Sequence, residues 1–399
     1  MAGQLALTGA APVRTDPWPR WPQWGHLEEE AVLRVLRSGS WGGYSEEVDD
    51  FEEAFALQQQ ALHCTATSNG TVSLVAALLA LGIGPGDEVI VPPYTFIATA
   101  STVRLVGAVP VFADIELGTY NLDVGAVEDA VSDRTKAIMP VHFAGQSADL
   151  DGLTELASRL GLAIIEDAAH APGSTWRGRP VGAIGTIGSF SFQSNKNLTA
   201  GEGGCIVTND DDLASRVWSQ VHHGRDRGGD WYEHPRLGSN LRISGWQAAV
   251  LNAQLASLPD QISRRTRSAQ WLRETLPGFG LRPLDRDSRS EVHAYHLFVL
   301  RYDPADFGGT SREVFVRALR AEGVPCSTGY PHPLYRQPAL VPPLSRVTPC
   351  PIAERACHEA LWLSHPLLLA PEADLSDIAT AVERISTNVG ELASHHNHE

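Results

Sequence analysis

Short apolar runs alternate along the first half of the chain with stretches of helical character. Each run is rich in β-branched residues and stops in polar or small residues, as in "GDEVIVPPYTF", "AVPVFADI", "TKAIMPVHFAG" and "GLAIIEDAAHA". Runs of this length and composition predict buried strands. The stretches between them, such as "DVGAVEDAVS" and "DLDGLTELASRLG", predict helices. Strands that alternate with helices in this way predict a mostly parallel sheet with helices on both faces.

The later part of the chain has a different character. "ISGWQAAVLNAQLASLPDQISRRTRSAQWLRETL" predicts a long helix, and "HAYHLFVLRY", "SREVFVRALRAEG" and "DLSDIATAVERI" after it indicate a smaller α/β unit. We therefore expect an α/β protein with an N-terminal arm and large domain over residues 1–259 and a small C-terminal domain over residues 260–399. The arm contains "DPWPRWPQWG", whose tryptophans are expected to pack on a neighbouring surface.

Net charge and cysteine content exclude several classes of protein. The formal net charge of −16 argues against nucleic acid and anionic membranes as partners. No apolar run reaches the roughly 18 residues that span a bilayer, and the N-terminus does not resemble a signal peptide. The five cysteines are scattered without a CxxC pair, which indicates reduced thiols in the cytoplasm and no zinc site. The tail "ASHHNHE" is interpreted as a frayed end rather than a metal site.

Lysine is rare in this chain, which draws attention to Lys196. The sequence contains two lysines, Lys136 and Lys196, against 29 arginines. A desolvated lysine amine can lose its proton and attack a carbonyl to form a Schiff base, whereas arginine stays protonated. Lys136 precedes an apolar run and is interpreted as a solvated strand start. Lys196 lies in the apolar, glycine-rich stretch "SFSFQSNKNLTAGEGG" and is interpreted as a covalent catalyst, with a plain surface charge as the alternative.

Other candidate groups fall where predicted strands end, which is where open parallel sheets bind ligands. Tyr94, His142 and Asp167 lie at such ends. For Asp167 three readings are open: a metal ligand, a helix N-cap, or the partner of a protonated heterocycle. Gly70 and Thr71 begin a predicted helix whose free amides form an anion site. An anion turn, a sheet-end carboxylate and a scarce lysine together point to pyridoxal phosphate (PLP).

The motifs resemble those of the DegT/DnrJ/EryC1/StrS aminotransferases, which are PLP enzymes of fold type I, the aspartate aminotransferase-like fold. The resemblance covers nearly the whole chain, through "SNGTVSLVAALLALGIGPGDEVIVPPYTF", "PVHFAGQSADLDGL", "IIEDAAHAPGS", "SFSFQSNKNLTAGEGG", "LGSNLRISGWQAAVLNAQL" and "CPIAERACHEALWL". It implies a large domain built on a mostly parallel sheet and a smaller C-terminal α/β domain.

The resemblance implies a role for each matching residue. Lys196 matches the lysine that forms the internal Schiff base and shuttles a proton, and Asp167 matches the acid on the pyridine nitrogen. The other matches are His170 at the ring's phenolic oxygen, Phe96 stacked on the ring, Gly70, Thr71 and Ser191 at the phosphate, and Asn240 at the phosphate of the neighbouring subunit. A working site would then require a homodimer with composite active sites.

Within the family, "GYPHPLYRQPAL" and "WLSHPLLLA" are similar to the cyclitol branch, which includes glutamine:scyllo-inosose aminotransferases and 3-amino-5-hydroxybenzoate synthases. This branch implies transfer of an amino group from L-glutamine or L-glutamate to a cyclic keto-polyol, a cyclitol or a keto-sugar, in antibiotic biosynthesis of the aminoglycoside type.

Two other activities remain open: a dehydratase/aromatase of the 3-amino-5-hydroxybenzoate synthase type, and a nucleotide-sugar aminotransferase. Sugar 3-dehydrases of the family carry histidine in place of Lys196, and a non-enzymatic regulator would have a damaged site. The candidate substrate contacts are Tyr94, His142, Arg225 and His332.

Overall fold

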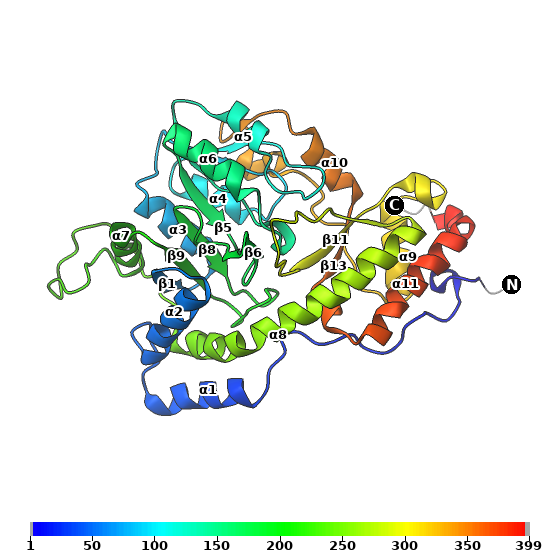
Figure 1. Ribbon diagram of the computed structural model, residues 1–399, viewed down its shortest axis with the longest axis horizontal. Helices are drawn as coiled ribbons and strands as arrows, with labels where there is room; N and C mark the ends of the chain where they lie inside the picture. Colours follow the sequence, from blue (N-terminus) through cyan, green and yellow to red (C-terminus); the bar gives the residue numbers. More distant parts are fainter. Residues whose placement is uncertain (1–2, 396–399) are drawn as a thin grey trace.

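A computed structural model describes residues 3–395 of the protein (Figure 1). The helices are α1 His26–Ser38, α2 Glu46–Gln58, α3 Gly70–Ala80, α4 Ala98–Leu105, α5 Val124–Ala130, α6 Leu150–Leu160, α7 Asp211–Val221, α8 Gly245–Thr275, α9 Arg312–Ala321, α10 Pro351–Glu359 and α11 Glu372–Thr387. The strands are β1 His63–Thr67, β2 Glu88–Val91, β3 Val109–Phe112, β4 Thr135–Ile138, β5 Ala163–Asp167, β6 Thr175–Trp176, β7 Arg179–Pro180, β8 Ile187–Ser191, β9 Gly204–Thr208, β10 Arg282–Pro283, β11 Leu297–Arg301, β12 Arg346–Val347 and β13 Ala360–Ser364. Short 3-10 helices lie in several of the connections.

The large sheet has eight strands in the order β1-β9-β8-β5-β4-β2-β3-β12. Its neighbours from β8 to β12 are parallel, and β9 is antiparallel to both β1 and β8. The predicted strands at β2, β3, β4 and β5 and the predicted helices α5 and α6 are confirmed. Because β5 and β8 are parallel neighbours, their carboxyl ends bring Asp167 and Ser191 to the same edge of the sheet.

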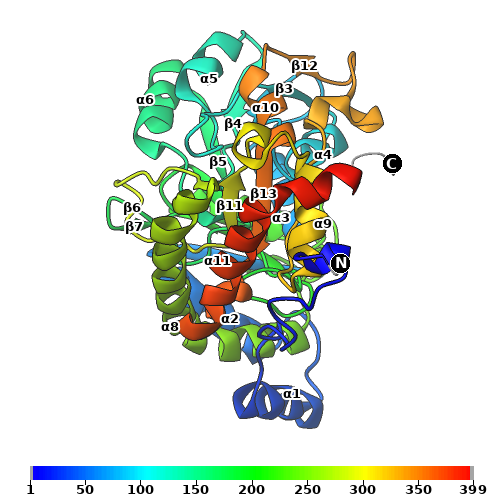
Figure 2. The same ribbon diagram turned by 90° about the vertical axis from the view of Figure 1, so that its right-hand side faces the viewer.

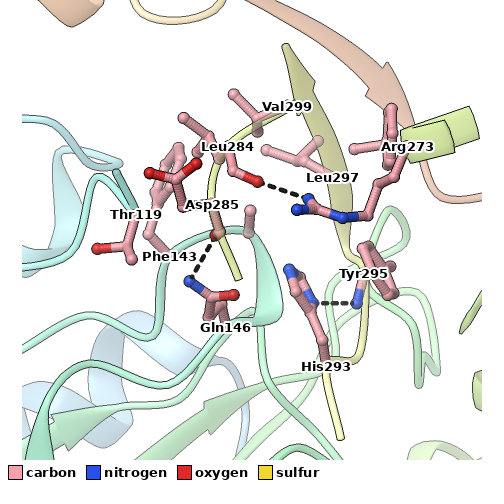
Figure 3. A pocket seen from close by; sticks show the side chains of 12 residues that line it. Thr119, Phe143, Gln146, Arg273, Leu284, Asp285, His293, Tyr295, Leu297 and Val299 are labelled. Carbon is pink, nitrogen blue, oxygen red and sulfur yellow. Dashed lines mark hydrogen bonds between the residues drawn. The ribbon is translucent and has the colours of Figure 1, made fainter. Parts of the chain in front are cut away.

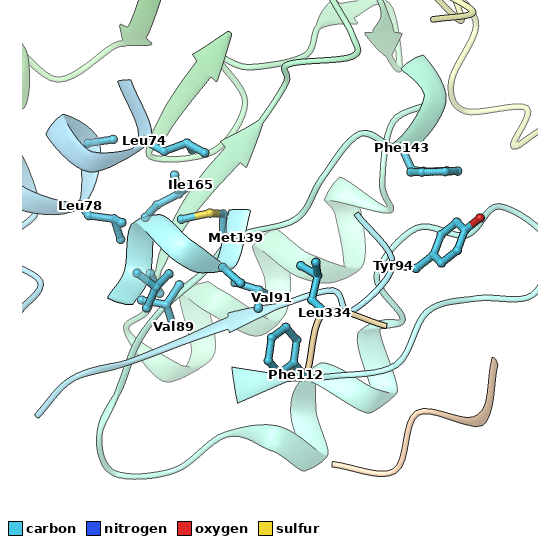
Figure 4. Close-up of a cluster of buried hydrophobic side chains, with 14 of the residues drawn as sticks. Leu74, Leu78, Val89, Val91, Tyr94, Phe112, Met139, Phe143, Ile165 and Leu334 are labelled. Atoms are coloured by element: carbon cyan, nitrogen blue, oxygen red, sulfur yellow. The ribbon is translucent and has the colours of Figure 1, made fainter. Parts of the chain in front are cut away.

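Both faces of the large sheet are buried, as expected for parallel strands covered by helices. Along β2, Val89 and Val91 join a core with α3, α4 and α7, whereas Ile90 between them joins a core with α5 and α6. Figure 4 shows part of the first core, where Leu74 and Leu78 of α3 lie over Val89. The alternation of side chains along a strand therefore distributes one apolar run between two helical layers.

A second sheet, β10-β11-β13, belongs to a smaller α/β unit in the later part of the chain. Its core contains side chains of α9, α11 and the second half of α8, and α11 lies between α8 and α9 in Figure 2. The long helix α8 is continuous through the predicted domain boundary at 259/260. The division into 1–259 and 260–399 stays a prediction. Two contacts cross it, because Leu5 packs in the core of the small unit and β12 pairs with β3 of the large sheet.

The N-terminal arm packs along both units. Trp18 Nε1 donates a hydrogen bond to the Gly323 carbonyl at 2.7 Å, and Trp21 Nε1 donates one to the Ser194 carbonyl at 3.0 Å. The expectation that arm tryptophans pack on a neighbouring surface is confirmed for these two, whereas Trp24 is 69% exposed. In the predicted frayed tail, His396 and His398 lie outside the described residues.

Two features of residues 3–395 concern membranes and metals. None of the helices in this range has the length and apolar character required to cross a bilayer. Within the same range, no three His, Cys, Asp or Glu side chains gather in a way that could hold a metal ion.

Candidate active site

A cavity of about 470 Å³ opens at the carboxyl edge of the large sheet. Its lining brings together seven of the residues singled out from the sequence: Gly70, Thr71, Phe96, Asp167, His170, Ser191 and Lys196. These residues come from segments up to 126 positions apart, between Gly70 and Lys196, and the parallel strand order places them at one site. The cavity is large enough for a cofactor of PLP size together with part of a substrate.

The N-terminus of α3 forms the anion-binding end of the cavity. Asn69 caps the helix by accepting a hydrogen bond from the Val72 amide at 3.0 Å, and Gly70 and Thr71 begin the first turn. A Cβ on Gly70 would lie 2.6 Å from the Ser191 Cβ, so glycine is required for β8 to approach this turn. The first-turn amides, the helix dipole and the Ser191 hydroxyl together suit a phosphate group.

The GEGG segment has a related structural role. A Cβ on Gly204 would lie 2.6 Å from the carbonyl carbon of Asn69. Glycine at this position therefore allows β9 to pass close to the capping residue of α3, and it supports the shape of the anion site from outside the cavity.

Asp167 is fixed at the end of β5 as a buried carboxylate. Its Oδ2 accepts a hydrogen bond from Thr99 Oγ1 at 2.8 Å and its Oδ1 accepts one from the Ala169 amide at 3.3 Å. Burial raises the pKa of Asp167, and the Thr99 hydrogen bond and the charge of Lys196 partly oppose that rise. β5 leads into a turn rather than a helix, so the N-cap reading of Asp167 does not hold.

Lys196 lies in the loop between β8 and β9 and lines the cavity together with Asp167. Burial lowers the pKa of Lys196 to about 8, and the charge of Asp167 opposes this shift. At neutral pH a pKa near 8 leaves about a tenth of the amine unprotonated, far more than for an ordinary lysine with a pKa of about 10.4. The environment therefore suits an amine that must act as a nucleophile.

His170 and Phe96 occupy other walls of the cavity. His170 is 5% exposed, and its Nδ1 is a buried atom without a hydrogen-bond partner among the described residues. Burial, followed by the charge of Lys196, holds the pKa of His170 well below its usual range, so the ring is neutral. Phe96 is 58% exposed, which leaves its ring accessible to a stacking partner.

Asn240 and Arg225 belong to an arm between α7 and α8 and do not line the cavity of their own chain. The arm projects from the end of α7 on the left of Figure 1. Asn240 is exposed and forms an antiparallel bridge with His222 at the base of the arm. The Arg225 guanidinium donates a hydrogen bond to the Tyr44 hydroxyl, so it anchors the base of the arm and is not placed to contact a substrate bound in its own chain.

The expectation that Tyr94 and His142 contact the substrate does not fit the geometry. Tyr94 is 1% exposed and packs among aromatic rings, with Phe143 and Tyr330 at 5.4 and 5.3 Å between centroids. Figure 4 shows Tyr94 and Phe143 within the first core. His142 is fully buried, where its Nε2 pairs with Glu166 at 2.9 Å and its Nδ1 accepts from the Ala148 amide at 3.2 Å. Both residues follow strands at the carboxyl edge of the sheet. Hydrogen bonds within the core occupy the ring nitrogens of His142, and neighbouring aromatic rings cover Tyr94.

His332 also fails to line the cavity and is exposed on the loop after Tyr330. Tyr330, two residues earlier in the same motif, lines the cavity instead. The motif "GYPHPLYRQPAL" was therefore informative through Tyr330, and the substrate role of His332 stays a prediction.

A second, much smaller cavity of about 20 Å³ has Gln146, His293 and Tyr295 among its lining residues (Figure 3). Several of its polar groups are already engaged, because Gln146 Nε2 donates to the Asp285 carbonyl at 3.2 Å and the Tyr295 amide donates to His293 Nδ1 at 2.8 Å. This volume holds at most a water molecule or two. It is therefore not a substrate site.

The sequence analysis missed several residues that line the main cavity. They are Asn69, Thr95, Thr99, Gln193, Asn195, Glu202, His296 and Tyr330 among others. Thr99 follows Phe96 closely in the sequence, and Gln193 and Asn195 shortly precede Lys196, so local spacing contained a signal for these three. His296 and Tyr330 come from the small unit, and only the tertiary fold brings them to the sheet edge.

Comparison with known proteins identifies the family. The model of the DegT/DnrJ/EryC1/StrS aminotransferase family matches residues 22–383. The chain belongs to this family. It is 37% identical to the L-glutamine:2-deoxy-scyllo-inosose aminotransferase of Streptoalloteichus tenebrarius, over 98% of this chain and 100% of that protein. It is also 37% identical to the 3-amino-5-hydroxybenzoate synthase of Amycolatopsis mediterranei, over 92% of this chain and 97% of that protein.

The structural comparison confirms the fold class. A crystal structure of 3-amino-5-hydroxybenzoic acid synthase superposes with a TM-score of 0.87 at 35% identity, over 95% of this chain and 100% of that chain. The protein is therefore a PLP-dependent aminotransferase of fold type I, and the predicted family, fold, enzyme class and cofactor are confirmed. The site fits the cofactor, since it offers an anion turn at Gly70, an unpartnered buried Nδ1 on His170 and a lysine with a lowered pKa.

Proposed function

We propose that this enzyme transfers the amino group of L-glutamine or L-glutamate to a cyclic keto-polyol, either a cyclitol of the scyllo-inosose type or a keto-sugar, in antibiotic biosynthesis. The charge of the cavity carries this proposal. Among its described lining residues, Lys196 is the only lysine or arginine, and Gln193, Asn195 and Tyr330 supply neutral polar groups. A neutral polyhydroxylated ring suits such a lining, because its hydroxyl groups pair with amide and phenol groups.

The residues of the chain divide the chemistry between them. PLP, when bound, supplies an electron sink for the amino-group transfer. Lys196 would hold the cofactor covalently, and its amine, with a pKa of about 8, would move the proton at the reacting carbon. Asp167 would hold the proton on the ring nitrogen, with Thr99 keeping the carboxylate oriented and ionised. The amides of Gly70 and Thr71 and the Ser191 hydroxyl would hold the phosphate.

A second candidate is an aromatising dehydration of the 3-amino-5-hydroxybenzoate synthase type. The similarity to that synthase, in sequence and in structure, supports it. It requires the same lysine and carboxylate, so the substrate rather than Lys196 or Asp167 distinguishes the two activities.

The test follows the nitrogen. The purified enzyme is incubated with scyllo-inosose or a related ketone and with glutamine labelled either at the α-nitrogen or at the amide nitrogen, and products are analysed by mass spectrometry. Label from the α-position is expected in an aminocyclitol, and label from the amide is not. A separate incubation with an aminated cyclohexene carboxylate tests the second candidate, which an unlabelled aromatic product would favour. No reaction in either incubation would contradict both candidates.

We further propose a homodimer in which each cavity is completed by Asn240 of the other chain. The exposed apolar side chains Trp24, Val32 and Leu33 border a groove of about 570 Å³ beside Ala200 and Gly201, a few residues after Lys196. The exposed arm between α7 and α8 carries Trp231 and Tyr232, which are 80% and 79% exposed. Apolar surface of this kind next to an active-site loop supports burial against a second copy of the chain. The five cysteines are buried and unpaired, which supports the proposed cytoplasmic location.

A further inference from the structure

His296 lies between the candidate cofactor site and the small unit. It immediately precedes β11, is 8% exposed and lines the main cavity. Its ring stacks on that of His170, with 4.3 Å between centroids and 29° between planes. The family resemblance assigned it no role, so its contacts have to be interpreted from the geometry alone.

The protonation state of His296 follows from its neighbour Asn197. Asn197 Nδ2 donates to the Ala294 carbonyl at 2.7 Å, which fixes the orientation of the amide and places Oδ1 at 3.1 Å from His296 Nδ1. An amide oxygen only accepts hydrogen bonds, so His296 Nδ1 must carry a proton. Burial, with the fields of His170 and Lys196, holds the pKa of His296 well below its usual range, so the ring is neutral and Nε2 has a free lone pair.

The hydrogen bond from His296 acts on the loop that carries Lys196. On the N-terminal side of Lys196, the Ser194 carbonyl accepts from Trp21 Nε1 at 3.0 Å and the Asn195 carbonyl pairs with His365 Nε2 at 3.0 Å. On the C-terminal side, the side chain of Asn197 is held by Ala294 and His296. The backbone on both sides of Lys196 is therefore attached to distant parts of the chain.

The segment that presents His296 is itself well fixed. The Tyr295 amide donates to His293 Nδ1, and the two rings stack with 3.8 Å between centroids and 2° between planes. Figure 3 shows both rings beside the small cavity. Tyr295 has a φ of 48°, in the left-handed region that costs a non-glycine residue roughly 1 kcal/mol or more. A backbone held in this conformation directs the next residue, His296, toward the cavity.

We propose that His296, protonated on Nδ1, is a positioning residue for the reaction: it holds Asn197, and through it the backbone of Lys196, while its ring face supports His170. The proposal rests on the proposed role of Lys196. It assigns His296 no direct contact with the reacting atoms. The proposal predicts that loss of the Nδ1 donor of His296 loosens the loop that carries Lys196. Loss of the ring alone, with a donor kept at the same place, should not loosen it.

The two lysines of the chain make a direct measurement possible. Full-length protein labelled with ¹³Cε-lysine and stripped of cofactor with hydroxylamine should give two lysine signals, from Lys196 and from Lys136 as an internal reference. In the wild-type protein the Lys196 signal is expected to titrate near pH 8. His296→Phe keeps a stacked ring and removes the donor, so water gains access to the amine and the Lys196 pKa should rise by about one unit. His296→Asn places an amide donor near the position of Nδ1 and should leave the Lys196 pKa within about 0.3 units of wild type.

Each outcome decides the proposal. A rise with His296→Phe but not with His296→Asn supports it. Equal shifts in both variants, a shift with His296→Asn only, or no shift in either would overturn it. His358→Phe, at an exposed position on α10, is the matched control and should leave both lysine titrations unchanged.

Two further measurements keep the test open if His296→Phe does not fold. Asn197→Ala removes the acceptor from the other end of the same hydrogen bond and should give the same rise in the Lys196 pKa. In wild-type protein, ¹⁵N-histidine spectra should show the His296 ring with Nδ1 protonated and Nε2 bare, and the opposite tautomer would overturn the proposal. None of these measurements needs bound cofactor, so a failure here is distinct from a failure of the proposed function, which would appear as no transfer of the α-nitrogen of glutamine to any ketone.

Discussion

Thr99 Oγ1 donates a hydrogen bond to Asp167 Oδ2 at 2.8 Å, within a nearly fully buried pair. Burial raises the pKa of Asp167, and the hydrogen bond from Thr99 is the largest of the effects that oppose this rise. In its proposed role Asp167 must remain ionised to hold a protonated ring nitrogen, and it therefore depends on Thr99 of α4.

Replacement of Thr99 by valine should shift the acid limb of the pH–rate profile. Valine keeps the shape and removes the donor, so the ionised form of Asp167 loses a bond worth about 1.5–3 kcal/mol. The pKa of Asp167 then rises, the carboxylate is protonated at higher pH, and turnover on the acid side should fall at least about tenfold. The measurement is kcat/KM from pH 5 to 9 for Thr99→Val. Thr102→Val, also buried in α4 but away from the cavity, serves as the control. An acid limb that stays in place would remove Thr99 from this role.

Lys196 should be the residue that takes up the cofactor. Borohydride reduction of the holoenzyme followed by peptide mapping should place the pyridoxyl group on Lys196. Because the pKa of Lys196 is lowered to about 8, the neutral amine increases as pH rises through 8, and the rate at which apoenzyme captures PLP should rise with it and level off above. Lys136→Arg should change neither the site of the label nor the pH midpoint. A label on Lys136, or a protein that binds no PLP, would contradict the assignment.

Asp167→Asn should retain the fold and lose most of the activity. An amide has nearly the same shape and can still pair with Thr99 and the Ala169 amide, but it carries no negative charge to hold a protonated ring nitrogen. We expect turnover to fall by about a thousandfold with little change in melting temperature. Circular dichroism and thermal unfolding check the fold, and steady-state kinetics check the loss. Turnover close to wild type would show that Asp167 has another role.

The central part of the fold could be predicted because its sequence signals are local. The apolar run at Val89–Val91 lies in a short strand ended by two prolines, and "TSNGTVS" contains both the cap Asn69 and the helix start at Gly70. Lys196 and Asp167 could be singled out as candidates because their chemistry is specific and their neighbours are apolar, and both line the same cavity. These features depend on a few consecutive residues, which a sequence displays directly.

The remaining contacts depend on packing between distant segments. Tyr94 and His142 follow strands as active-site residues do, yet an aromatic cluster surrounds one and Glu166 pairs with the other. Conversely, His296 and Tyr330 belong to the small unit, and nothing in their local pattern indicates that they line a cavity of the large sheet. Position at the end of a strand places a residue near the active site. Core packing then decides whether its side chain is exposed to the cavity and can contact a ligand.

Asn240 should act on the cavity of the other chain. Asn240→Ala is expected to lose most activity by itself, as is Lys196→Ala. In heterodimers of these two variants one site lacks both residues and the other is intact, so the purified heterodimer should recover about half of the wild-type activity. Differently tagged chains, co-expressed and purified on both tags, provide the sample.

The control for this experiment pairs Lys196→Ala with Asp167→Asn. Both residues line the cavity of their own chain, so every site in that heterodimer is damaged and no recovery is expected. Equal recovery in both pairings, or none in either, would show that Asn240 does not complete a neighbouring site.

The acceptor should be a neutral ring ketone rather than a nucleotide-linked sugar. A diphosphate is usually held by arginine or lysine, yet Lys196 is the only such residue that the described lining offers. Two arginines that could bind a diphosphate are already engaged, since Arg225 donates to Tyr44 and Arg336 pairs with Glu354 at 2.7 Å. A neutral ring would instead be selected by its hydroxyl groups, because a wrong isomer leaves buried polar groups unpaired.

Steady-state rates are to be compared for scyllo-inosose, related cyclitol ketones and nucleotide-linked 3-keto and 4-keto sugars. Gln193→Leu should raise KM for the preferred ketone about tenfold, because one amide partner is lost. Efficient amination of a nucleotide sugar, with no turnover of the free ring ketones, would contradict the prediction. It would indicate that the diphosphate is bound by the arm between α7 and α8 of the partner chain.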